Sequence, residues 1–175
     1  MAAFKFAASC VALTICAIEP SAAAEPGPIK IAVFAFELDD KSAGGGIVGP
    51  QDAIDADNLK KSAEEARRML AASGRYSIVD AGSAAGEVSA ASGLRNCNGC
   101  EGALAKKLGA DQSMAGIVTR VSRTEFTLQI VVRDAQTGAV VTNAFTGLRM
   151  GANYAWPRGV TWLMQHQILP APRAQ

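Results

Sequence analysis

Two cysteines, Cys97 and Cys100, have the residue type and the spacing to do chemistry. They stand as Cys97-Asn98-Gly99-Cys100, directly before an Ala/Leu/Lys segment that is typical of a helix. A thiolate at a helix N-terminus is stabilised by the backbone N–H groups and the dipole there, so the pair could exchange a disulfide with a substrate. The same spacing also suits a structural disulfide that closes the loop into the helix. Both interpretations remain open.

Other cysteine chemistries are excluded by the neighbouring residues. Haem attachment needs a histidine directly after the second cysteine, and Glu101 stands there. Structural zinc needs four ligands, whereas beyond residue 24 the chain has only this cysteine pair and a single histidine, His166. A thioredoxin-like pair would follow the first strand of its fold, whereas this pair follows a long irregular stretch. We therefore expect no metal and no cofactor, and favour the structural disulfide over a redox pair.

Three carboxylates gather where the first predicted strand ends: Glu37, Asp39 and Asp40. Sheets of α/β proteins often bind ligands at the carboxyl ends of their strands, so these residues could form a small-ligand or metal-binding site. The alternative is a group of solvated loop charges. The loop that they open, residues 39–51, contains Gly44–Gly49, which matches G-x-G-x-x-G. It begins too far from the strand end to hold a dinucleotide, and no Lys-Ser/Thr follows it.

The last predicted helix has two contrasting faces. One side, mostly apolar, is expected to face the core and carries Val160, Leu163, Met164, Gln167 and Ile168. The opposite side carries Arg158, Trp162, His166 and Leu169. An indole and a leucine on an outward face could mark a partner-binding site, with Arg158 stacked on Trp162. Alternatively, a neighbouring loop covers them. No serine or cysteine partner indicates a catalytic triad for His166.

The N-terminal residues predict export. Lys5 precedes an apolar stretch over residues 6–18, and small residues at 22–24 suit a signal peptidase, so we expect cleavage before Glu25 and a single periplasmic domain over residues 25–175. The apolar stretch is too short to span a bilayer. A formal net charge of +1 without a basic run argues against binding to nucleic acid or an anionic membrane.

The elements that position these residues follow the order β-α-β-α-β-β-β-α. This pattern predicts an α/β (α+β) fold with a mixed five-stranded sheet and helices packed on it. The expected strands cover residues 30–38, 76–80, 113–121, 125–133 and 140–148, with a hairpin turn over 134–138. The expected helices follow Asp52, span residues 101–108, and run from Pro157 towards Pro170.

Several short motifs are spread over this chain: Phe36-Glu37-Leu38, Ser73-Gly74-Arg75-Tyr76 leading to Asp80, the Cys97–Cys100 pair, Leu108-Gly109-Ala110-Asp111, Arg133-Asp134 with Thr137-Gly138, and Trp156 with Arg158-Gly159 and Trp162. With these motifs the chain resembles a family of small secreted proteobacterial proteins classed as a domain of unknown function. The family offers no accepted catalytic residues to carry over.

Two of these motifs, the Leu-Gly-Ala-Asp step and the Asp-x-x-Thr-Gly hairpin, are also similar to the N-terminal domain of TolB and the periplasmic domain of the curli secretion channel. The resemblance implies an α/β fold and protein contact rather than catalysis. Relatives of the small family are often found near periplasmic quinoprotein alcohol-oxidation systems, and the resemblance therefore implies an accessory role. We therefore predict a non-catalytic periplasmic adaptor that binds another envelope protein through the first loop or the last helix. The alternatives are a thiol–disulfide redox protein and a small-ligand or metal-binding module.

Overall fold

The structure is a computed structural model that describes residues 27–42, 53–122, 124–149 and 156–170. The predicted signal peptide (1–24) and the glycine motif (44–49) lie outside the described residues. The strands are β1 Ile29–Val33, β2 Glu37–Asp40, β3 Tyr76–Val79, β4 Gln112–Arg120, β5 Glu125–Asp134 and β6 Val140–Arg149. The helices are α1 Ala53–Ala72, α2 Ala85–Ala90, α3 Cys100–Lys107 and α4 Trp156–Leu163, with 3-10 turns at Gly82–Ala84 and Leu94–Asn96 and a π-helical turn at Met164–Ile168.

The strands form one mixed sheet in the order β3-β1-β4-β5-β6, and β2 also lies beside β4. β1 pairs in parallel with both β3 and β4, and β2 pairs in parallel with β4. β4, β5 and β6 form an antiparallel meander. The expected mixed sheet with helices packed on it is therefore confirmed, and its late meander follows the predicted order.

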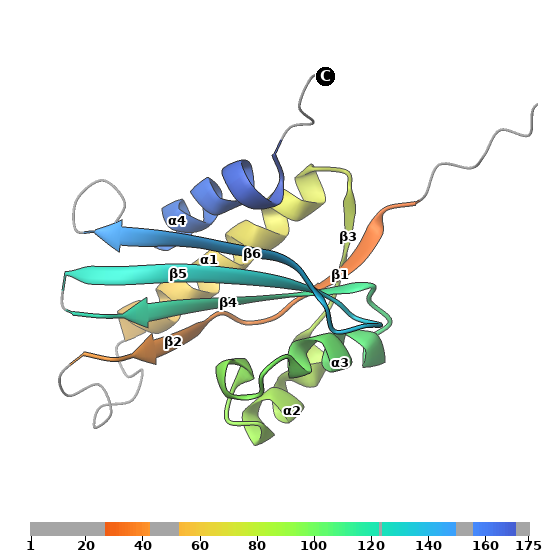
Figure 1. Ribbon diagram of the computed structural model, residues 1–175, viewed down its shortest axis with the longest axis horizontal. Coiled ribbons are helices and arrows are strands. Elements are labelled where there is room, and N and C mark those ends of the chain that lie inside the picture. Colours follow the sequence, from red (N-terminus) through yellow and green to blue (C-terminus); the bar gives the residue numbers. More distant parts are fainter. Residues whose placement is uncertain (1–26, 43–52, 123, 150–155, 171–175) are drawn as a thin grey trace, which may run out of the picture.

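The two faces of the sheet are covered differently (Figure 1). α1 and α4 pack on one face, where the larger core includes Ile31, Leu70, Leu128 and Trp156. α2 and α3 cover one end of the other face, over a smaller core with Phe34 and Leu104. We call these the α1–α4 face and the α2–α3 face. None of the described helices has the length and apolar character needed to cross a bilayer.

A bulge interrupts the first strand, so the expectation of one continuous strand over residues 30–38 is wrong. Val33 pairs with Met114 and Glu37 with Ile117, which leaves three residues opposite two. The extra residue shifts the alternation of side chains between faces. Phe34 consequently packs in the α2–α3 core, whereas Phe36, two residues later, packs in the α1–α4 core.

Candidate functional site

The structure joins Cys97 and Cys100 in a disulfide at the start of α3, with an S–S distance of 2.00 Å. Gly99 precedes the helix with φ +104°, a conformation that side chains rarely adopt. Both cysteines are half-buried and pack against the α2–α3 core. The bond therefore fixes the loop to the first turn of α3.

A buried ion pair lies beside this disulfide. The carboxylate of Glu101, which is 5% exposed, accepts a 2.6 Å hydrogen bond from Nε of Arg133 on β5. Arg133 also donates to the carbonyl of Gly138 in the hairpin turn, at 3.1 Å. Among the described residues, one group of three has side-chain atoms close enough together to hold a metal ion. It consists of Cys97, Cys100 and Glu101, whose potential ligand atoms lie within 4.8 Å of one another. Because the sulfurs are bonded to each other, they offer no thiolate to a metal.

The structure gives the three carboxylates of the first strand separate partners instead of one site. Glu37 accepts backbone N–H groups from Leu94 at 2.6 Å and Arg95 at 3.2 Å, so it holds the 3-10 turn Leu94–Asn96 onto the sheet. Asp39 pairs with Lys41 at 3.1 Å. Glu37 therefore has a structural role that the sequence did not indicate.

Asp40 belongs to a charged triad with Arg120 and Asp55. The Arg120 guanidinium lies 2.7 Å from Asp40 and also contacts Asp55 at the start of α1. The Ser42 hydroxyl, which hydrogen-bonds to Asp40 at 2.6 Å, and then Arg120 lower the pKa of Asp40 against the opposing effect of burial. Burial opposes the charge on Arg120, but the two carboxylates outweigh it and raise the pKa of Arg120. The triad ties β2, β4 and α1 together.

Trp162 on α4 and His166 in the following π-helical turn form one exposed feature. Their rings stack with centroids 4.7 Å apart, and Trp162 is 45% exposed. Nδ1 of His166 lies 2.8 Å from the carbonyl oxygen of Trp162. A carbonyl only accepts, so Nδ1 carries the proton and Nε2 is the acceptor in the neutral ring. Arg158 is exposed one turn earlier. The expected outward position of these three residues is confirmed.

Leu169 does not share that position, so this part of the expectation is wrong. It is half-buried and packs against the α1–α4 core. The reason is the π-helical turn Met164–Ile168, where the N–H of Leu169 donates to the carbonyl of Met164 at 2.7 Å. A five-residue turn rotates the following side chain relative to α-helical spacing, which the 3.6-residue pattern could not reveal.

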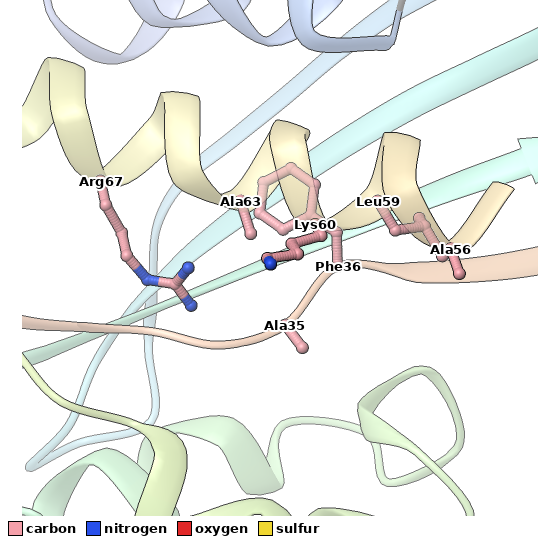
Figure 2. A pocket seen from close by; sticks show the side chains of 7 residues that line it. All are labelled: Ala35, Phe36, Ala56, Leu59, Lys60, Ala63 and Arg67. Atoms are coloured by element: carbon pink, nitrogen blue, oxygen red, sulfur yellow. The ribbon is translucent and has the colours of Figure 1, made fainter. Parts of the chain in front are cut away.

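A pocket that the sequence analysis did not find lies between α1 and the bulge (Figure 2). Its volume is about 280 Å³, and Phe36, Leu59 and small alanines form its apolar lining. Lys60 and Arg67 from α1 are its charged residues, and Figure 2 shows both extending toward the bulge. Their i, i+7 spacing could have indicated one helix face, but the bulge is not visible in the sequence, so nothing indicated a hollow beside that face.

Solved structures with related folds are distant. The C-terminal domain of LpoB from Salmonella enterica is 14% identical, with a TM-score of 0.47 over 73% of this chain and 88% of that domain. PelC from Paraburkholderia phytofirmans is 16% identical, with a TM-score of 0.46 over 79% of this chain and 89% of its own. TolB from Acinetobacter baumannii is 11% identical, with a TM-score of 0.42 over 77% of this chain and 26% of its own. Likenesses this distant carry no functional conclusion.

The sequence relationship is more definite. No curated protein matches the chain. A match over residues 29–168, from the start of β1 to the end of the π-helical turn, covers nearly all of the described fold. This confirms the resemblance to a family without an assigned function: the chain belongs to the family DUF3280, described as "Protein of unknown function (DUF2380)".

Proposed function

We propose that the protein is a periplasmic accessory protein that binds another envelope protein and catalyses no reaction of its own. The observation that carries this proposal is the exposed stack of Trp162, on α4, with His166 in the π-helical turn that follows. The opposite side of α4 is fully used in packing, with Val160 and Leu163 completely buried. Large aromatic side chains on a supported helix are typical anchors of protein interfaces.

The stack is held in place before any partner arrives. His166 is fixed by its hydrogen bond to the Trp162 carbonyl and by ring contact, so little side-chain freedom is lost on binding. Nε2 of the neutral His166 ring offers an acceptor at the edge of the apolar surface. Two further parts of this proposal rest on the sequence: export to the periplasm on the N-terminal residues, and a connection with quinoprotein alcohol oxidation on the family resemblance.

Photocrosslinking in cells tests the proposal. A benzophenone amino acid replaces exposed Arg158, one turn before Trp162, in one variant and exposed Ala90, on α2, in the control variant. We expect position 158 to crosslink to one envelope protein and position 90 to give no such adduct. Adding Trp162→Ala to the position-158 variant should abolish capture of that protein, and Trp162→Ala alone should change the free energy of unfolding by less than about 1 kcal/mol. Adducts from neither position, with the protein present in the periplasm, would reject the proposal.

A further inference from the structure

The bulge leaves a short stretch of sheet edge without a neighbouring strand. β3 pairs with β1 only as far as Val79, opposite Ala32, and β2 pairs with β4 alone. Among the described residues, no strand lies beside Ala35 and Phe36 on the side of β3, and the backbone groups of these two residues make no hydrogen bond. Unpaired backbone groups at a sheet edge are a template for another extended chain.

Two arginines mark the ends of this bare stretch. Arg67 on α1 donates to the carbonyl of Val33 at 2.8 Å, before the bulge. Arg95 donates to the carbonyl of Leu38 at 3.1 Å, after it. Arginine side chains thus satisfy the backbone carbonyls before and after the bulge, and the backbone groups of the bulge between them stay unpaired.

The surface around the bulge is apolar and bordered by positive charge. The pocket of Figure 2 adjoins a second hollow of about 350 Å³, since Phe36 and Leu59 line both. Lys60 and Arg67 border the first hollow and no acidic residue lines it. Arg95 borders the second hollow and lies 3.7 Å from its one carboxylate, Glu37, which also accepts backbone N–H groups. The excess positive charge is therefore at the first hollow.

We propose that the bulge is a docking site for an extended, acidic segment of a partner protein. The segment lies beside the bulge, between Arg67 and Arg95, and its backbone pairs with Ala35 and Phe36. Small apolar side chains enter the two hollows, and an Asp or Glu carboxylate binds Lys60 and Arg67. The charge of the pocket selects an acidic segment over a basic one. This inference rests on the proposed function in one respect, because it names a second contact of the same adaptor.

The probe is a seven-residue synthetic peptide, acetyl-Thr-Val-Asp-Val-Glu-Val-Thr-amide, titrated into ¹⁵N-labelled protein spanning residues 25–175. We expect shifts at the Ala35 and Phe36 amides and at neighbouring Leu59. A peptide with lysines in place of the two acids should not bind. In an extended peptide, alternate N–H groups point to opposite sides, and only one set can face the sheet edge. We therefore expect N-methylation of that set to abolish binding, and N-methylation of the other set to leave binding intact.

Variants on α1 test the charge contribution. Lys60→Glu should weaken peptide binding about fivefold to tenfold, corresponding to about 1–1.4 kcal/mol. Lys61→Glu is the matched control, because both lysines have a carboxylate partner four residues away on α1 (Glu64 for Lys60, Asp57 for Lys61). Lys61 does not line the pocket, so its replacement should leave affinity unchanged. Both lysines are exposed, so neither variant should lose its fold.

Three results would overturn the inference: no shift at millimolar acidic peptide, equal binding of the acidic and basic peptides, or shifts confined to another surface such as Trp162. The outcome is separate from that of the proposed function. Peptide binding at the bulge without a crosslinked envelope protein would keep the docking site and reject the adaptor. A crosslinked partner without peptide binding would keep the adaptor and reject the docking site.

Discussion

The ring of Phe36 fills the space that a side chain at position 116 would need. A Cβ placed on Gly116 would lie 2.4 Å from Cε2 of Phe36, closer than real Cβ contacts. The bulge turns Phe36 onto the α1–α4 face, where Gly116 on β4 lets the ring approach the backbone. The bulge, the ring and the glycine therefore form one unit, and the same unit opens the sheet edge beside the pocket.

Gly116→Ala should lower the free energy of unfolding by about 1–3 kcal/mol, because the ring must leave its position or the strands must separate. Gly147→Ala on β6 is the matched control, since a Cβ there would meet nothing within 4 Å; we expect a change within about 0.5 kcal/mol. Urea unfolding measures both. Adding Phe36→Leu to Gly116→Ala should cost less than the sum of the single changes, and strict additivity would contradict the contact.

The sequence predicted the sheet and its helices well because both follow repeating patterns. The alternation over β5 and the Asp134 turn, with Gly138 at φ +73°, were readable from local residue types. The bulge was not, since a run such as Phe34-Ala35-Phe36 is apolar throughout and shows no change of face. One extra residue in a strand leaves no signal when both faces are buried.

The candidate site was less predictable because it depends on which residues meet. Trp162 and His166 were found from helical spacing alone. Glu37 looked available in the sequence, but tertiary contact gives it the N–H groups of Leu94 and Arg95. Arg120 and Asp55 are distant from Asp40 in the chain, so nothing local indicated their pairing. The sequence thus identified exposed side chains better than it identified side chains that are hydrogen-bonded or ion-paired within the fold.

The Cys97–Cys100 disulfide should behave as a structural bond. The loop that it closes is short, so replacing both cysteines with serine should cost about 2 kcal/mol of stability by the chain-entropy relation. Its reduction potential should lie below about −300 mV, because the bond is half-buried, packs against the α2–α3 core and fixes the loop to α3. Equilibration with glutathione and dithiothreitol buffers measures it. A potential near −200 mV, or catalysed reduction of insulin, would instead support the thiol–disulfide alternative.

Acid should weaken the Asp40–Arg120–Asp55 triad through Asp40. Its pKa in the folded protein lies below the ordinary 3.8, so its contribution to stability is complete above a pH of about 4 and is lost as the pH falls through the folded value. Asp40→Asn should therefore be less stable than the natural protein at pH 7, with the difference shrinking below pH 4. Urea midpoints across this range measure it.

The control is Asp57→Asn, which removes an exposed i, i+4 pair with Lys61 and should cost at most about 1 kcal/mol. Arg120→Met goes further, because it leaves two partly buried carboxylates without their cation; we expect a loss of about 3–5 kcal/mol. A difference between Asp40→Asn and the natural protein that stays constant from pH 7 to pH 3 would contradict this account.

The amide of Gln167 protects the exposed edge of the sheet. Its Oε1 accepts from the N–H of Phe145, and its Nε2 donates to the carbonyl of the same residue, both at 3.2 Å. β6 is an edge strand, and Phe145 is 57% exposed, so without this amide the edge would offer backbone groups beside an apolar ring.

Gln167→Ala should lower the free energy of unfolding by about 1 kcal/mol and promote pairing between the β6 edges of two molecules. Light scattering at increasing concentration measures that association. Exposed Gln165→Ala, two residues earlier, is the control and should remain like the natural protein. Equal association of the two variants would show that Gln167 does not guard the edge.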